Sequence, residues 1–310
     1  MSIPPKSFDQ LSNQLNKDSE EKNLAEVPPV TMIGVLGAGT MGHGIAQVAA
    51  AAGFQVLLRD INDAAVAKGK QAIELNLAKG IERGKITEQD LTQTLARIST
   101  TTELPDLGTA GLIIEAAPEN LKLKQKLLRE CEAITGAQCI WATNTSSLSI
   151  TEIARSAARP ENVVGMHFFN PVHIMKLVEI VLGDRTSEQT AEAVRQVAAR
   201  MKKEPIMVRD FPGFASSRLG VTLGLEAMRM VEQGVASPRD IDTAMELGYN
   251  HPMGPLRLTD LVGLDVRLSI AEYLHSKLGS ETFRPPDILR RMVSEGRLGK
   301  KTGRGFYDWN

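Results

Sequence analysis

The chain has 310 residues, 42% of them hydrophobic and 24% charged, as in ordinary globular proteins large enough for two domains. Its 36 basic and 37 acidic side chains leave a formal net charge of -1, which excludes a global positive field that would recruit nucleic acid or an anionic membrane. No run reaches the roughly 18 apolar residues of a membrane span. We therefore expect neither nucleic acid nor a membrane as a partner.

The N-terminal residues 1–29 are polar and close with Pro28 and Pro29, and we predict a flexible polar tail there. This segment contains acids and lacks a continuous apolar stretch, which argues against a secretory signal and a mitochondrial presequence. Cys131 and Cys139 are the only cysteines, too few for a disulfide framework, so we expect reduced packing residues. These features predict a cytoplasmic protein.

Short apolar runs alternate with amphipathic helices from residue 30 to residue 210. The first run, 30–36, ends at glycines and is typical of a strand buried on both faces. Strands separated by helices predict a mainly parallel sheet with helices on both faces. The expected strands are 30–36, 54–59, 112–116, 139–143, 162–168, 177–181 and 206–208. The expected helices are 40–52, 64–82, 88–96, 121–134, 150–157 and 187–202.

The pattern changes after Asp210, and only helical periodicity follows. Ser237 is a good N-cap, with Pro238 at the first helical position and Asp240 in the first turn. The expected helices of this half are 214–232, 237–247, 254–261 and 265–278. The domain boundary is therefore predicted near Asp210.

A glycine-rich turn joins the first predicted strand to the first predicted helix. Its sequence, Gly37, Ala38, Gly39, Thr40, Met41 and Gly42, matches G-x-G-x-x-G. The first glycine allows the tight turn, the second lets the backbone approach a pyrophosphate, and the third lets the helix pack on the strand. The N-terminus of the helix attracts the phosphate charge. The strand and helix around this segment predict a dinucleotide site rather than a glycine turn without a ligand.

Asp60 ends the second predicted strand, where an acid would accept hydrogen bonds from the ribose hydroxyls and repel a 2′-phosphate. This favours NAD over NADP, although the neighbouring Arg59 could accept that phosphate. The predicted fold class is therefore α/β, with a Rossmann-type, mainly parallel sheet domain over 30–210 followed by an all-α C-terminal domain over 211–310.

A histidine and a glutamate each stand alone as the titratable group of an apolar run. His167 lies in 165–171 and Glu179 in 176–181. Such groups would be costly to bury apart but useful side by side as an acid–base pair. From the residues alone, a satisfied core histidine and an acid at a strand edge stay an alternative. No cluster of histidines and acids on one helix face suggests a metal site, and we expect no metal.

Several motifs together resemble the L-3-hydroxyacyl-CoA dehydrogenase family, in particular its short-chain bacterial members that act on 3-hydroxybutyryl-CoA. The matching segments span about residues 31–310 and are 37–47, 119–122, 144–148, 165–171, 212–214, 251–255, 260–265 and 301–307. The resemblance implies reversible oxidation of a (3S)-3-hydroxyacyl-CoA to the 3-oxoacyl-CoA with NAD, a reaction used in fatty-acid β-oxidation and in other pathways.

The resemblance also implies roles for individual residues. His167 would take the proton from the 3-hydroxyl group, and Glu179 would hold the other imidazole nitrogen. Ser146 would hydrogen-bond the substrate close to the nicotinamide. Further cofactor contacts are implied at Glu119, Lys124, Asn170 and Lys301.

The chain departs from the family pattern at three positions near the substrate. Ser217 stands where an asparagine usually helps to bind the substrate carbonyl, and a hydroxyl reaches less far. Asn76 and Arg83 occupy positions where serine and lysine commonly contact CoA, and both could still bind it. The resemblance further implies a homodimer formed through the helical domain, which also closes the substrate cleft.

Two other functions stay open at this point. One is a dehydrogenase of a hydroxy acid without CoA, and the other is a non-catalytic, NAD-binding, crystallin-like protein. The intact His167, Glu179 and Ser146 argue against the second.

Overall fold

A computed structural model describes residues 30–309, and the tail predicted over 1–29 lies outside the described residues. The strands form one sheet in the order β3-β2-β1-β4-β5-β6-β7-β8. All neighbours pair in parallel except β6 and β7, so the expected mainly parallel sheet is confirmed. The strands are β1 (Met32–Leu36), β2 (Gln55–Arg59), β3 (Ile98–Thr101), β4 (Leu112–Glu115), β5 (Ile140–Thr143), β6 (Val163–Phe168), β7 (Leu177–Leu182) and β8 (Glu204–Arg209).

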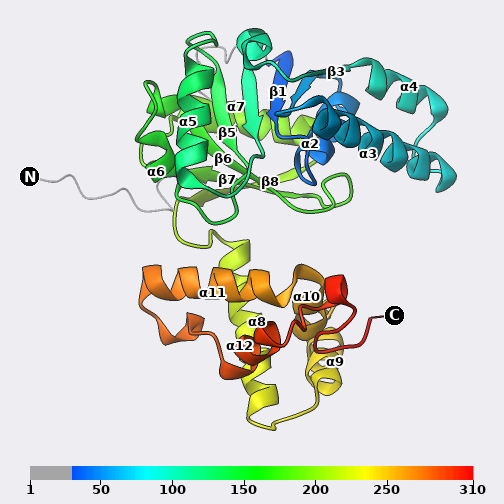
Figure 1. The fold of residues 1–310 in the computed structure, drawn as a ribbon, viewed down its shortest axis with the longest axis vertical. Coiled ribbons are helices and arrows are strands. Elements are labelled where there is room, and N and C mark those ends of the chain that lie inside the picture. The colour runs from blue at the N-terminus through cyan, green and yellow to red at the C-terminus, as the bar shows by residue number, and fades with distance from the viewer. Residues whose placement is uncertain (1–29, 310) are drawn as a thin grey trace, which may run out of the picture.

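Helices cover both faces of the sheet (Figure 1). One apolar core joins the sheet to α2 (Gly42–Ala51), α3 (Asp63–Glu82) and α7 (Glu188–Arg200). The other core joins it to α5 (Leu121–Glu132) and α6 (Ile150–Ala154). Burying both faces explains why the strands read as continuous apolar runs rather than as alternating ones. The carboxyl ends of the parallel strands are left to carry the functional loops.

The helical half follows β8 as a separate cluster (Figure 1). Its longest helix, α8 (Ser216–Glu232), runs through the middle of this half. The cluster has its own apolar core, which includes Val221 and Leu225 of α8. The remaining helices are α9 (Pro238–Gly248), α10 (Pro255–Val262), α11 (Leu264–Leu278) and α12 (Asp287–Ser294). None of the helices in residues 30–309 has the length and apolar character to cross a bilayer.

One strand and one α-helix were not predicted from the sequence. The strand β3 has only Ile98 buried, so its sequence shows no apolar run, and it gains its place by pairing with β2 at the edge of the sheet. The helix α12 is eight residues long, and its buried side chains, Ile288, Leu289 and Met292, have the spacing of one helix face. The helix α4 (Glu88–Ala96) was predicted with its bounds unchanged.

Candidate active site

The His167–Glu179 pair is formed by two neighbouring antiparallel strands. The register of β6 and β7 places the two residues directly opposite each other. Nδ1 of His167 lies 2.7 Å from Oε2 of Glu179, and the glutamate is 0% exposed. This bond fixes the tautomer, so Nε2 is the imidazole nitrogen left to exchange a proton with another group.

The Glu179 carboxylate is held by the start of the helical half. Oε1 accepts hydrogen bonds from the backbone amides of Ala215 at 3.1 Å and Ser216 at 2.8 Å. Oε2 accepts a further bond from the Ser216 hydroxyl at 2.8 Å. Burial alone would raise the pKa of Glu179, but the hydrogen bonds from His167 and Ser216 outweigh it, and the pKa lies below its ordinary value. Glu179 is therefore a carboxylate that can stabilise a protonated imidazole.

Aromatic rings form the walls around the imidazole. The ring centroid of His167 lies 4.6 Å from that of Phe169 and 5.9 Å from that of Phe214. The backbone before Phe169 is fixed by Asn144, whose side chain accepts a bond from the Phe168 amide at 2.8 Å. The histidine is 7% exposed, so its ring is largely shielded from bulk water.

The glycine-rich turn has the geometry of a dinucleotide cradle. Gly37 has φ of +97°, and a side chain on Gly42 would lie 1.6 Å from the Gly37 carbonyl oxygen. A Cβ atom at Gly39 would meet no protein atom within 4 Å, so this glycine leaves open space beside an exposed backbone. Thr40 is exposed and Met41 half-buried just before α2 begins. This combination fits a pyrophosphate at the start of α2.

Asp60 ties the end of β2 to this turn. Its Oδ2 accepts a hydrogen bond from the Ala38 amide at 2.6 Å, and its Oδ1 accepts one from the Ile61 amide at 2.7 Å. The carboxylate is thus oriented beside the turn, with lone pairs left for ribose hydroxyls. The neighbouring Arg59 donates to the Thr102 carbonyl at 3.1 Å, a contact that keeps its side chain on the β3 side.

Glu119 organises the loop after β5. Its Oε1 accepts bonds from the amides of Ser146 at 3.2 Å and Ser147 at 3.1 Å, and also from the Thr145 hydroxyl. Burial would raise the pKa of Glu119, but the charge of Lys124 and the hydroxyl groups of Thr145 and Ser147 outweigh it and lower the pKa. Glu119 therefore fixes the backbone that carries Ser146.

Lys124 lies beneath this loop. Its side chain is 1% exposed and contacts Glu115 at 2.7 Å, while Oε2 of Glu119 is 3.6 Å away. The ammonium group also donates to the Ala117 carbonyl at 3.2 Å. Glu115, the partner of Lys124, also accepts a hydrogen bond from the Thr143 hydroxyl at 2.7 Å. With its ammonium group enclosed in this way, Lys124 supports the loop from below, and its predicted contact with the cofactor stays a prediction.

The other predicted residues lie around this centre. Asn170 is exposed just after β6, and the segment behind it is held by the buried Lys203, which donates to the carbonyls of Val172 and Met175. Ser217 is half-buried at the second position of α8, directly after the serine that contacts Glu179. Lys301 forms an ion pair with Asp265 in the helical half, and no contact brings it to the glycine-rich turn in this structure. The predicted roles of these residues stay predictions.

A cationic cavity of about 350 Å³ opens between α2, α3 and the loop after β6. Asn76 lines it and donates to the side chain of Gln47 at 3.3 Å. Burial, together with the charges of Lys203, His43, Arg83 and Lys85, lowers the pKa of His173 on its wall. Arg83 itself is exposed at the end of α3. The positive side chains fit an anionic group better than a neutral one.

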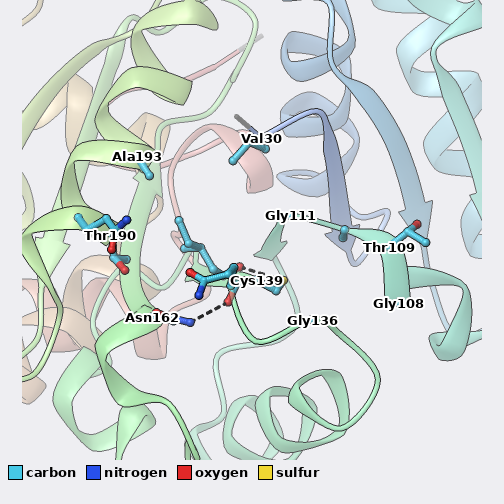
Figure 2. A pocket seen from close by; sticks show the side chains of 13 residues that line it. Val30, Gly108, Thr109, Gly111, Gly136, Cys139, Asn162, Thr190 and Ala193 are labelled. Carbon is cyan, nitrogen blue, oxygen red and sulfur yellow. Dashed lines mark hydrogen bonds between the residues drawn. The ribbon is translucent and has the colours of Figure 1, made fainter. Parts of the chain in front are cut away.

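A second cavity, of about 260 Å³, lies at the amino ends of central strands of the sheet (Figure 2). Val30, Gly111, Cys139 and Asn162 line it, and they lie within two residues before the strands β1, β4, β5 and β6. The side-chain amide group of Asn162 donates to the Cys139 backbone carbonyl at 3.4 Å (Figure 2). The amino ends of the strands are thus far from the site at their carboxyl ends, and this cavity belongs to a different part of the molecule.

The strand order, the glycine-rich turn with Asp60 and the buried His167–Glu179 pair define a two-domain nicotinamide-dependent dehydrogenase. Family models agree with this class: the 3-hydroxyacyl-CoA dehydrogenase NAD binding domain matches residues 32–211, and the C-terminal domain of the same family matches residues 213–309. The chain belongs to the 3-hydroxyacyl-CoA dehydrogenase family.

Individual relatives agree with this assignment. The chain is 48% identical to a probable 3-hydroxybutyryl-CoA dehydrogenase of Bacillus subtilis, over 90% of this chain and 98% of the relative. It is 40% identical to the mitochondrial hydroxyacyl-coenzyme A dehydrogenase of Sus scrofa, over 97% of this chain and 98% of the relative. The crystal structure of (S)-3-hydroxybutyryl-CoA dehydrogenase from Ralstonia eutropha superposes with a TM-score of 0.88 at 44% identity, covering 91% of this chain and 99% of that one.

Sequence reasoning missed three polar residues of the site. Ser216 and Thr145 directly neighbour the predicted Ser217 and Ser146, so only the hydrogen bonds distinguish which serine or threonine contacts an acid. Glu115 could have been found, because it is the only titratable residue of the apolar strand β4, which is the same signal that singled out Glu179.

Proposed function

We propose that this chain catalyses the reversible oxidation of short-chain (3S)-3-hydroxyacyl-CoA thioesters, such as 3-hydroxybutyryl-CoA, to the 3-oxoacyl-CoA with NAD. The observation that carries the proposal is the buried pair in which Nδ1 of His167 lies 2.7 Å from Glu179. The names of the relatives from Bacillus subtilis and Ralstonia eutropha support the short acyl chain.

His167 is the general base of the oxidation in this proposal. Its Nε2 takes the proton from the 3-hydroxyl group as the C3–H bond breaks, and it returns the proton in the reverse direction. The Glu179 carboxylate stabilises the imidazolium ion that forms. Bound NAD supplies the acceptor for the hydride that leaves C3. Ser146 and Ser217 are proposed to orient the substrate by hydrogen bonds to its oxygen atoms.

Different residues are proposed to bind the two large ligands, NAD and CoA. Gly37, Gly39 and Gly42 with Asp60 hold NAD, and the cationic cavity beside Asn76 holds an anionic part of CoA. The further predicted NAD contacts are Thr40, Met41, Glu119, Lys124, Ser146, Asn170 and Lys301, and the further CoA contact is Arg83. The cations on the rim of the cavity near Asn76 support this division.

The test is an assay at 340 nm with NADH and acetoacetyl-CoA. We expect the absorbance to fall with the purified protein, and His167→Gln to lower kcat by about 100-fold to 10,000-fold, the usual contribution of a general base. The control is the titration of NADH binding, which should be unchanged in His167→Gln. A series of acyl chain lengths and both nicotinamide coenzymes would define the specificity.

The same assay separates the two other functions. Turnover of free 3-hydroxybutyrate without turnover of its CoA thioester would indicate a hydroxy acid dehydrogenase. NADH binding without turnover of any acyl-CoA would indicate a crystallin-like protein and would contradict the proposal.

We also propose that the chain forms a homodimer through its helical half. Large apolar side chains are exposed on three adjoining helices: Leu219 and Leu223 of α8, Leu258, Leu261 and Val262 of α10, and Val266 of α11. The buried Arg267 lies beside α8 near Gly220, and its Nε has no hydrogen-bond partner among residues 30–309.

A cytoplasmic location stays a prediction, to which the free thiols of Cys131 and Cys139 lend support.

A further inference from the structure

The Oε2 atom of Glu179 is shared by two hydrogen-bond donors. It accepts from His167 at 2.7 Å and from the Ser216 hydroxyl at 2.8 Å. Glu179 is 0% exposed, so bulk water does not compete for this oxygen. Ser216 therefore contacts the group on which the charge state of His167 depends.

We propose that Ser216 is a positioning residue that sets the proton affinity of His167 by withdrawing charge from Glu179. The proposal rests on the proposed function, in which His167 is the general base. No role for Ser216 follows from the family resemblance described above.

The Ser216 hydroxyl acts on the pair electrostatically. A hydroxyl that donates to a carboxylate stabilises its negative charge and leaves less of that charge to attract an imidazolium ion. The carboxylate with this bond therefore stabilises an imidazolium less than the carboxylate without it. In a buried site such effects are larger than in water, because the local dielectric is low.

The backbone separates this charge effect from a simple structural role. Oε1 of Glu179 is fixed by the amides of Ala215 and Ser216, and neither bond needs the Ser216 side chain. An alanine at position 216 keeps both amides and removes only the hydroxyl. The carboxylate should then keep its place while its charge becomes more available to His167.

The other charged groups on the surrounding elements lie outside the hydrogen bonds of the His167–Glu179 pair. Arg218 of α8 lies over the ring of Phe211, and Arg200 of α7 lies over the ring of Phe54. On the elements packed against β6 and β7, the remaining charged side chains are Glu152, which lines a cavity with Asp210, the ion pair Glu192 and Arg195, and the exposed Glu188, Glu204 and Arg209. Further along α8, Glu226 pairs with Arg229, and Glu232 accepts a hydrogen bond from the Ile288 amide. Glu179 is thus the charged partner through which Ser216 would act on His167.

The test is an NMR titration of the histidine rings in the full chain, labelled with ¹³C at histidine. The chain has 5 histidines, and the signal that is lost in His167→Gln identifies His167. We expect Ser216→Ala to move the titration midpoint of His167 upward by about half a pH unit, the size expected for one hydrogen bond acting through a neighbour. Ser216→Thr, which keeps a hydroxyl, should restore the wild-type midpoint.

The matched control is Ser276→Ala, which removes a hydroxyl from α11 that donates to the Tyr273 carbonyl in its own helix. It should leave the His167 midpoint unchanged. In the oxidation direction, the acid limb of the kcat/KM profile should move to higher pH by the same amount in Ser216→Ala. At pH values below the midpoint, kcat/KM of this variant should therefore be about three-fold lower than that of the wild-type protein.

A midpoint in Ser216→Ala that stays unchanged or moves downward would overturn the proposal, as would a threonine variant that behaves like the alanine variant. The NMR titration needs no turnover. If the wild-type protein is inactive with every acyl-CoA, the proposed function fails, whereas the link between Ser216 and His167 is still decided by the midpoints.

Discussion

Ser217 is the residue at which a single substitution is most informative about substrate binding. It is half-buried and directly follows Ser216, which contacts Glu179, and among residues 30–309 its hydroxyl makes no hydrogen bond. An asparagine reaches further and can still donate to a carbonyl oxygen. We therefore expect Ser217→Asn to leave kcat/KM for acetoacetyl-CoA unchanged or to raise it by up to about five-fold, the effect of one ordinary hydrogen bond.

The comparison for this variant is Ser217→Ala, which should lower kcat/KM by a similar factor, since it removes the donor. Steady-state kinetics on both proteins at one pH is sufficient. A loss of more than about ten-fold in Ser217→Asn would mean that the substrate pocket is built closely around the serine.

At the residue scale, the sequence predicted the centre of the site better than its surroundings. His167 and Glu179 could be found because a titratable group in an apolar run is costly unless it is paired, and the structure pairs them. The contact from Ser216 could not be found in this way. It depends on the angle at which α8 leaves the sheet domain, and adjacent serines look the same in a sequence.

The turn between β1 and α2 allows a prediction at the scale of an element. A methyl group at Gly42 would lie 1.6 Å from the Gly37 carbonyl oxygen, so Gly42→Ala must open the turn. We expect it to lower the free energy of unfolding by about 3 kcal/mol and to weaken NADH binding strongly. Denaturant unfolding and fluorescence titration with NADH measure the two effects.

Gly39→Ala is the matched variant, because its methyl group would meet no protein atom within 4 Å. It should leave the stability within about 0.5 kcal/mol of the wild-type value and still weaken NADH binding, since the methyl group would occupy the space needed by the pyrophosphate. Unchanged NADH binding in Gly39→Ala would show that the dinucleotide does not approach the turn.

Elements were predictable where local signals agree with long-range pairing. The continuous apolar runs predicted β1, β4 and β5 correctly, because these central strands are buried on both faces. The edge strand β3 exposes Ser99 and Thr100, so pairing with β2 rather than apolar character determines its conformation. The antiparallel direction of β7 follows from the short connection after β6, because a parallel neighbour would need a crossover of about a dozen residues or more.

At the scale of the whole molecule, the change of pattern after Asp210 falls in the segment between β8 and α8. Asp210 itself holds this segment to the sheet domain, since its Oδ2 accepts bonds from the Ser149 hydroxyl at 2.7 Å and the Thr151 amide at 2.8 Å. The helical periodicity of the C-terminal half does not predict which apolar faces stay exposed. The structure describes those faces on α8, α10 and α11.

These exposed faces lead to a prediction about assembly. Leu219 and Leu223 lie four residues apart on α8, so one helix face carries both, with exposed fractions of 66% and 44%. Two carboxylates on this face would be desolvated in a dimer, at a cost of several kcal/mol. The double variant Leu219→Glu with Leu223→Glu should therefore elute with the mass of one chain in light scattering, whereas we expect the mass of two chains for the wild-type protein. Leu75→Glu, on an exposed position of α3, should keep the wild-type mass, and a double variant that also keeps it would exclude this face as the interface.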